Sequence, residues 1–330
     1  MYNKSMKNKI LEILNLHFNE YVSGEEICKN LNVSRAAIWK NIKKLQEEGY
    51  IIESSTKKGY CLKSIYDPLD ENTIQQDLPC FYKKITILKE VDSTNEEMKR
   101  LSSSLQEGDI LLAECQTKGK GRSGRLFHSP KHNGMYMSIF LKPTFSITQS
   151  LKITACTSCA VYDAIKELYN LDASIKWVND VFIKDKKIAG ILCEASLEMN
   201  TASLDYMIIG IGLNIHTYEQ IEELKTIAAS IEDFTDKIVS RNEIIHKILE
   251  RFYYYYRTIN ENTFLPIYKQ NSYVLNQTID VYSQNEVYKA KALDIDENAH
   301  LLVEKEDGTQ VLLNSGEISI RKQKGEKNEI

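Results

Sequence analysis

The chain has 330 residues, 42% of them hydrophobic and 27% charged, without a low-complexity tract, so it is long enough for two or three globular domains. It has neither a signal-peptide pattern nor an apolar run of about 18 residues, which predicts a cytoplasmic protein that has no membrane partner. Its seven cysteines are scattered along the chain, as expected in a reducing compartment.

The charge is unevenly distributed along the chain. The formal net charge is -4. Residues 1–65 hold 11 Lys and Arg against 7 Asp and Glu, a balance of +4, whereas the remainder holds 31 against 39, a balance of -8. The basic part of the chain is therefore its first segment.

That first segment has the pattern of a winged helix-turn-helix. Residues 7–18 carry apolar side chains at helical spacing, and Ser23 with Glu26 forms a capping box that opens a second helix. Ser34 caps a third helix, and residues 50–64, YIIESSTKKGYCLKS, indicate two short strands around a turn. Three helices followed by a basic hairpin predict a winged helix-turn-helix domain over residues 1–65.

In such a domain the third helix enters the major groove, and the wing reaches phosphates. The alternatives are that the charges form only the solvated face of a small helical domain, or that the wing contacts protein. The order of capped helices, turn and basic hairpin favours DNA. We therefore expect DNA-binding side chains at Ser34, Arg35, Trp39, Lys40, Lys43, Lys57 and Lys58.

After a linker expected around Pro68, the stretch AECQTKGKGRSGRLFHSP (113–130) combines a G-x-G-x-x-G spacing with four cations. A dinucleotide-binding turn needs a helix directly after its glycines, but here Pro130 and Gly134 interrupt the chain before a strand-like alternation. Kinase and P-loop motifs are also absent from the sequence. Two interpretations stay open: a loop that neutralises a phosphate, with Arg122 able to bind it in bidentate fashion, or an exposed basic turn.

Further on, KWVND (176–180) and KIAGIL (187–192) place polar residues at the ends of buried strands, the usual location of a site, although Asp180 could simply be a turn residue. Cys156 and Cys159 form a C-x-x-C inside a predicted helix. No second pair completes a zinc ligand set, so we expect a packed helix face and no metal site built by the protein.

The basic glycine loop, K-W-x-N-D, K-x-x-G-I-L and IIGIGLNIH (208–216) occur in the order found in biotin protein ligases, and the chain resembles that family over essentially its whole length. The winged helix in front resembles its bifunctional BirA type, which also represses biotin genes. The resemblance implies an α+β multidomain protein. Its parts would be a winged helix-turn-helix (1–65), a central mixed α/β biotin/lipoate ligase-like catalytic domain (66–269) and a small C-terminal SH3-like β-barrel (270–330).

The resemblance also implies chemistry and partners. Biotin and ATP, with Mg²⁺, would give biotinyl-5′-AMP, and the biotinyl group would pass to one lysine of the biotin carboxyl carrier domain of a carboxylase. The adenylate would also act as corepressor by favouring a homodimer on operator DNA. The implied catalytic residues are Lys187, Arg122 and Asp180, with Asp180 orienting either the acceptor lysine or the metal. The implied ligand-binding residues are Ser93, Thr94, Asn95, Gln116, Lys120, Gly121, Arg122 and Lys187.

Two departures from the family pattern stand out, namely Lys120 where arginine is common and Val178 in place of proline. Lysine keeps the charge but loses the planar fork of donors. Two other functions compete with this one. A lipoate ligase shares the central fold but is not expected to carry the winged helix, and a transcription factor with an inactive ligand-sensing domain would have lost the loop cations and Lys187, which are retained.

Overall fold

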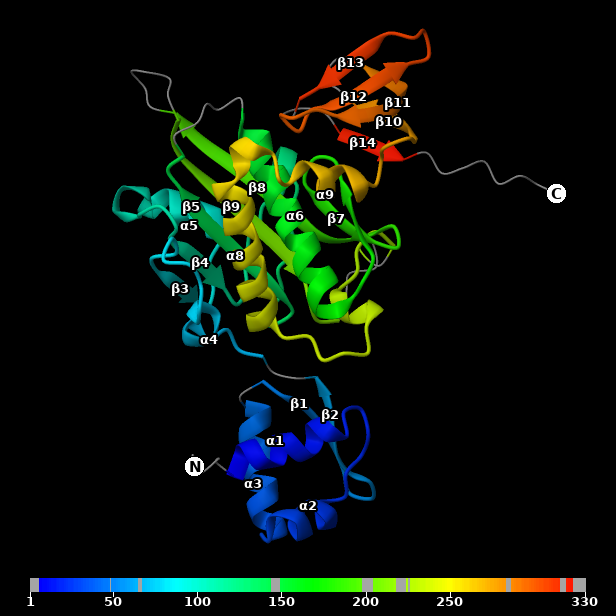
Figure 1. Cartoon of the computed structure of the whole chain (residues 1–330). Coiled ribbons are helices and arrows are strands. Elements are labelled where there is room, and N and C mark those ends of the chain that lie inside the picture. Colours follow the sequence, from blue (N-terminus) through cyan, green and yellow to red (C-terminus); the bar gives the residue numbers. More distant parts are fainter. Residues whose placement is uncertain are drawn as a thin grey trace, which may run out of the picture. The chain divides into compact units, whose positions relative to one another are not determined.

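The computed structural model describes residues 6–47, 49–64, 67–143, 149–197, 204–217, 224, 226–282, 286–314 and 319–322. The chain forms two compact units, Met1–Pro68 and Leu69–Ile330 (Figure 1). The expected linker around Pro68 coincides with this division, but it is shorter than the sequence suggested. The side chain of Asp70 already accepts a hydrogen bond from Thr73 N (2.8 Å), and this cap starts the short helix α4 (Glu71–Gln75).

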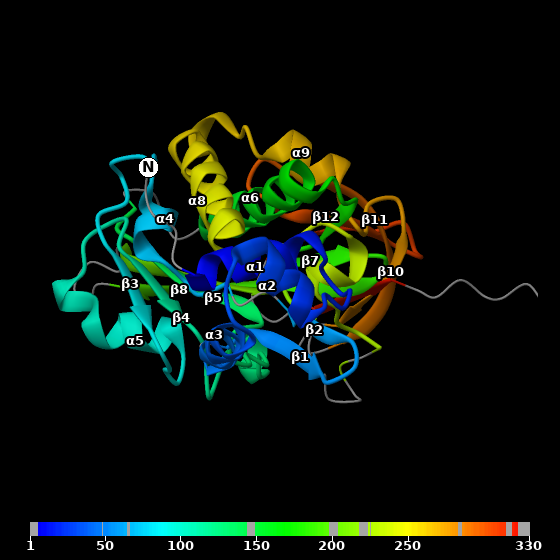
Figure 2. The same ribbon diagram turned by 90° about the horizontal axis from the view of Figure 1, so that it is seen from below.

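The first unit contains α1 (Met6–Leu16), α2 (Gly24–Leu31), α3 (Arg35–Glu47) and the antiparallel hairpin of β1 (Ile51–Ser55) and β2 (Gly59–Ser64) (Figure 2). Ser23 Oγ accepts from Glu26 N (3.0 Å) and Ser34 Oγ from Ala37 N (3.2 Å), so the predicted caps begin α2 and α3. The apolar sides of the three helices and the hairpin enclose one core. The predicted winged helix-turn-helix is confirmed.

Within the described residues of the second unit, seven strands form one mixed sheet in the order β3-β4-β5-β9-β8-β7-β6. Among the pairs that these described strands form, only β3–β4 is parallel. The strands are β3 (Ile85–Leu88), β4 (Ile110–Ala113), β5 (Gly134–Leu141), β6 (Ala173–Lys176), β7 (Asp180–Ile183), β8 (Lys186–Leu197) and β9 (Leu204–Asn214).

Different helices pack on the two faces of this sheet. Helices α6 (Ser150–Tyr169) and α8 (Arg241–Arg257) pack over one face in the main core, and α5 (Thr94–Leu101) packs on the other (Figure 1). Because side chains alternate along a strand, Met137 and Ile139 of β5 enter the main core, whereas Ser138 and Phe140 belong to the α5 face. Short 3-10 helices cover Ser102–Ser104, Arg122–Gly124, Ile231–Phe234 and Ile259–Glu261.

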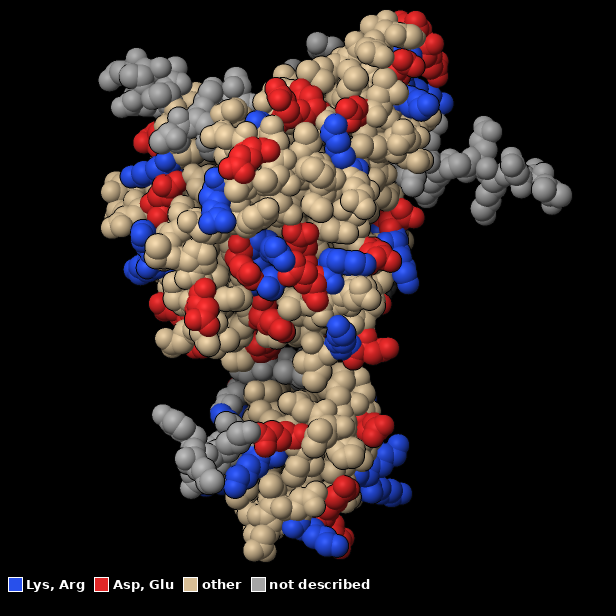
Figure 3. Space-filling view, viewed as in Figure 1, with Lys and Arg blue, Asp and Glu red and all other residues tan. Residues whose placement is uncertain are grey.

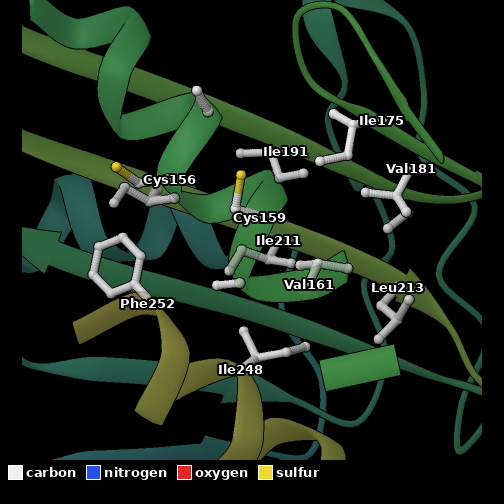
Figure 4. Close-up of a cluster of buried hydrophobic side chains, with 14 of the residues drawn as sticks. Cys156, Cys159, Val161, Ile175, Val181, Ile191, Ile211, Leu213, Ile248 and Phe252 are labelled. Atoms are coloured by element: carbon white, nitrogen blue, oxygen red, sulfur yellow. The ribbon is translucent and has the colours of Figure 1, made fainter. Parts of the chain in front are cut away.

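Cys156 and Cys159 lie on α6 within this core, near Phe252 of α8 (Figure 4). Both thiols are fully buried, and burial raises the pKa of each well above its ordinary value. The predicted packed helix face is therefore what the C-x-x-C forms.

The C-terminal part follows α9 (Leu265–Gln270). Its strands are β10 (Thr278–Tyr282), β11 (Val287–Ile295), β12 (Leu301–Lys305), β13 (Gln310–Leu313) and β14 (Ser319–Lys322), all antiparallel, in the order β13-β12-β11-β10-β14. Trp177 Nε1 donates to Ala299 O (2.9 Å) and joins this part to the central sheet. The predicted fold class is confirmed. No helix among the described residues combines the length and apolar character needed to cross a membrane.

Candidate active site

A pocket opens on the sheet face that carries α5, opposite the α6 and α8 layer. All eight residues predicted to bind ligand line it, although they come from four separate segments of the sequence: Ser93, Thr94, Asn95, Gln116, Lys120, Gly121, Arg122 and Lys187. The fold thus brings the separate motifs to one place.

The first turn of α5 forms one wall of the pocket. Thr94 N and Thr94 Oγ1 both donate to Gln116 Oε1, at 2.9 and 3.2 Å. Gln116 Nε2 donates in turn to Ser129 Oγ (2.9 Å), so this side chain is held at both ends of its amide. Ser93 occupies the N-cap position, but its side chain makes no capping hydrogen bond.

Asn95 is oriented by residues that the sequence did not single out. Its Nδ2 donates to Glu194 Oε2 (2.8 Å) and Leu192 O (3.3 Å), so both amide hydrogens are directed at protein acceptors. Ser138 Oγ lies 2.6 Å from Asn95 Oδ1 and 2.7 Å from Thr94 Oγ1, and its single hydrogen can serve one of them at a time. Asn95 therefore presents a hydrogen-bond acceptor, Oδ1, on this wall.

Glycines on β8 and β9 form the floor. A Cβ placed on Gly210 would lie 2.5 Å from Asn95 Oδ1, and one on Gly212 would lie 2.6 Å from the Phe127 ring. A side chain at either position would displace the Asn95 amide or the Phe127 ring. The signal was present in the motif IIGIGLNIH, which served as a family marker without being assigned a role.

The glycine loop is a small hairpin, since Gly121 N donates to Arg125 O (2.7 Å). Lys120 and Arg122 line the pocket, whereas Lys118 and Arg125 do not. Lys118, Lys120 and Arg125 are exposed, and Arg122 is half-buried. Two of the four loop cations therefore lie at the pocket.

Arg122 is the more enclosed of the two pocket cations. Its Nη1 donates to Asn179 Oδ1 (3.1 Å), and Asn179 Nδ2 donates to Ile191 O (2.9 Å). Burial lowers the pKa of the Arg122 guanidinium, which nevertheless stays charged at neutral pH. A partly desolvated cation at this position favours binding of an anion. Asn179, the fourth letter of K-W-x-N-D, was not assigned a role from the sequence.

Lys187 lies on β8 and also lines the pocket, and its Nζ is 2.7 Å from Asp180 Oδ1 on β7. Asp180 does not itself line the pocket. Its position is that of a carboxylate behind the lysine, so it can hold the ammonium in place. The preceding Trp177–Val178 peptide bond is cis.

The predicted DNA-binding residues lie on the first unit. Trp39 is 57% exposed on α3, and Lys40 and Lys43 are exposed on the same helix. Arg35 is paired with Glu25 (3.3 Å), and the Ser34 side chain is engaged in its cap. Lys57 and Lys58 are exposed in the turn between β1 and β2. Figure 3 shows Lys and Arg side chains interspersed with acidic ones on the visible face of this unit.

Comparisons with known proteins agree with this arrangement. Residues 87–214 match the Biotin/lipoate A/B protein ligase family, residues 7–61 an HTH domain and residues 274–321 the Biotin protein ligase C terminal domain. The bifunctional ligase/repressor BirA of Bacillus subtilis is 32% identical over 312 residues, which cover 92% of this chain and 95% of that protein. Its namesake in Escherichia coli is 30% identical over 204 residues, 62% of each chain. A solved biotin protein ligase of Aquifex aeolicus, in complex with biotin and ATP, superposes with a TM-score of 0.65 at 30% identity, covering 73% of this chain and 100% of that one.

Proposed function

This chain belongs to the biotin protein ligase family, in the bifunctional ligase/repressor branch of the BirA type, and from this premise we propose that it makes and transfers biotinyl-5′-AMP. The observation that carries the proposal is the convergence of eight residues, predicted from separate motifs, on one pocket. The carrier domain of a biotin-dependent carboxylase is the proposed acceptor, in the cytoplasm.

The proposed first half-reaction joins the biotin carboxylate oxygen to the α-phosphorus of ATP and releases pyrophosphate. Arg122 and Lys187 both line the pocket and would meet the phosphate from different elements, where fixed cations stabilise developing charge without reorganisation. In the second, an acceptor lysine amine attacks the acyl carbon and AMP leaves. Asp180, 2.7 Å from Lys187, is proposed to keep that ammonium aimed at the phosphate.

Mg²⁺ is proposed to bind together with ATP. Within the described residues no group of three or more His, Cys, Asp or Glu side chains is placed to hold a metal. Mg²⁺ commonly binds through substrate phosphates, waters and one or two carboxylates, so the absence of a protein cage is compatible with it. When bound, it would neutralise phosphate charge.

The test is intact-mass spectrometry of a purified carrier domain after incubation with the protein, ATP and biotin, with lipoate in a parallel reaction. We expect one biotinyl addition and no lipoyl addition. Lipoyl transfer, or no transfer from an intact protein, would contradict the proposal.

We further propose that residues 1–65 form the repressor domain, that residues 66–269 perform ligation, and that residues 270–330 form the C-terminal domain. The adenylate would act as corepressor by favouring a homodimer, since one winged helix reads a half-site and two must be spaced by a dimer. Ordering of the glycine loop by the ligand would shift the population toward the dimer. Sedimentation of the ligand-free and adenylate-loaded protein tests this, and equal dimer affinity in both states would rule it out.

A further inference from the structure

A chain of four alternating charges runs from the glycine loop to the back of the pocket. Lys120 Nζ lies 2.8 Å from Glu96 Oε1, and Lys99 Nζ lies 2.8 Å from the same oxygen. Lys99 Nζ is also 2.6 Å from Glu194 Oε1, and the other oxygen of Glu194 accepts from Asn95. The glycine loop is thus connected to the Asn95 amide through Glu96 and Lys99 of α5 and then Glu194.

Glu96 is the point at which α5 holds the loop. It directly follows Thr94 and Asn95, which line the pocket, and lies one turn before Lys99 on α5. Hydrogen bonds from Lys120 and then Lys99 lower the pKa of Glu96, so its carboxylate stays ionised at neutral pH.

The loop is also held on its other side. Arg122 donates to Asn179, and the Phe127 ring packs over Gly212 of β9. Lys120 forms an antiparallel β-bridge with Leu126 across the hairpin, so a contact that restrains Lys120 restrains both sides of the hairpin. The hairpin is therefore held at two places: Arg122 attaches it to Asn179, and the Glu96–Lys120 ion pair attaches it to α5.

We propose that Glu96 is a positioning residue for the ligase reaction: through Lys120 it holds the glycine loop over the pocket while the acyl adenylate waits for its acceptor. This assigns Lys120 a role different from phosphate binding, because its charge is already met by a carboxylate of the protein. The phosphate is then left to Arg122 and Lys187. The inference rests on the proposed ligase function.

The neighbouring residue Glu97 offers a matched control. The side chains of Glu96 and Glu97 are 28% and 25% exposed, and each pairs with a half-exposed cation. The partner of Glu97 is Arg100 on the same helix (2.8 Å), not a residue of the loop. Glu96→Gln and Glu97→Gln therefore each remove one comparable charge, but only the first disconnects the hairpin.

The experiment loads each protein with radiolabelled biotin and ATP and follows escape of the adenylate into a large excess of unlabelled biotin and ATP. We expect Glu96→Gln to form adenylate at the wild-type rate but to release it about two- to fivefold faster, the range for one partly exposed ion pair. Added salt should accelerate release from the wild type and from Glu97→Gln, and much less from Glu96→Gln, since screening acts only on a pair that exists. Equal release from both variants, or slower adenylate formation by Glu96→Gln, overturns the proposal.

A second measurement does not depend on catalysis. Trypsin cleavage after Arg125 in the ligand-free proteins, followed by mass spectrometry, reports opening of the hairpin directly. We expect faster cleavage in Glu96→Gln than in Glu97→Gln at equal melting temperatures, and equal cleavage overturns the proposal. If the wild type forms no adenylate, the proposed function fails, while the cleavage rates still decide the role of Glu96.

Discussion

Arg122 illustrates how a single side chain in this site can have two tasks. Its guanidinium donates to Asn179 and so fastens the loop, and it faces a pocket in which an adenylate phosphate is proposed. Lys187 reaches the same pocket from β8, with Asp180 behind it. Removal of Arg122 should therefore affect retention of the intermediate more than its formation.

We predict that Arg122→Gly releases biotinyl-AMP before an acceptor arrives. The variant loses a charge-assisted hydrogen bond worth about 1.5 to 3 kcal/mol and gains backbone freedom in the loop. Released adenylate should label lysines of a bystander such as serum albumin, detected with streptavidin. The control is Arg125→Gly, which removes an exposed cation from the same hairpin. If Arg122→Gly ligates its acceptor normally and leaves the bystander unlabelled, the result would favour the alternative interpretation of this loop as an exposed basic turn.

A second residue-scale prediction concerns the pocket floor. In Gly210→Ala the new methyl group would lie 2.5 Å from Asn95 Oδ1, so Asn95 must move away from Ser138 and Glu194. Overpacking of this kind costs about 1 to 3 kcal/mol. The family resemblance assigns the turn of Ser93, Thr94 and Asn95 to contact with biotin. We therefore expect the KM for biotin to rise about tenfold or more, while the KM for ATP changes little. Both constants come from pyrophosphate-exchange assays, and an equal rise in the two would argue for general misfolding.

At the scale of secondary-structure elements, a buried ion pair connects the end of β4 to the start of α8. Arg241 is fully buried, and its Nη1 donates to Glu114 Oε2 (2.8 Å), while the other Glu114 oxygen accepts from Leu69 N (3.2 Å). Burial is the largest single influence on the pKa of Glu114 and would raise it, but the charge and hydrogen bond of Arg241, together with the hydrogen bond from Leu69 N and the charge of His132, hold the pKa below its usual value. His132 Nδ1 lies 3.1 Å from the same carboxylate.

We predict that Glu114→Gln lowers the free energy of unfolding by about 3 to 5 kcal/mol at pH 7, because it removes the negative charge that Glu114 places beside the buried Arg241. A carboxylate whose folded pKa is depressed stabilises the fold above its unfolded pKa, and this contribution disappears as the pH falls through the folded value. The difference in unfolding free energy between wild type and variant should therefore shrink below about pH 4.5, the ordinary pKa of a glutamate side chain. Urea unfolding at a series of pH values measures it, and a difference independent of pH would exclude the ion pair as its cause.

Local sequence signals predicted where helices and strands form, but they did not predict which residues become neighbours in space. Ser23, Ser34 and the alternation in 134–141 lie within single segments, and the structure contains the helices and strand that they indicate. The roles of Ser138 and Glu194 depend instead on sheet register, which pairs Ser138 with Gly210 and Gly210 with Leu192, two residues before Glu194. Such pairings join residues distant in sequence, and no local periodicity encodes them.

At the scale of the whole molecule, the two units have separate cores and opposite charge balances. The core of the first unit is built entirely from residues before Pro68, and the sheet with its helices is built from residues after it. Residues 1–65 carry a balance of +4, and the remaining chain carries -8. Phosphate contacts contribute much of the affinity for DNA, so the basic unit is the expected binder and the acidic one should be repelled.

We predict that a chain beginning at Tyr66 loses DNA binding. The measurement is a gel shift on a fragment carrying the promoter of the organism's biotin genes, with biotin and ATP present so that the adenylate forms. Full-length protein should bind with an affinity that falls steeply with salt, because each phosphate contact contributes a slope of about 0.9 in log affinity against log salt. The double variant Lys40→Ala with Lys43→Ala, which keeps the core of the first unit, should bind more weakly and with a smaller slope. A truncated chain that melts cooperatively and still shifts the fragment with unchanged affinity would contradict the assignment of DNA binding to the first unit.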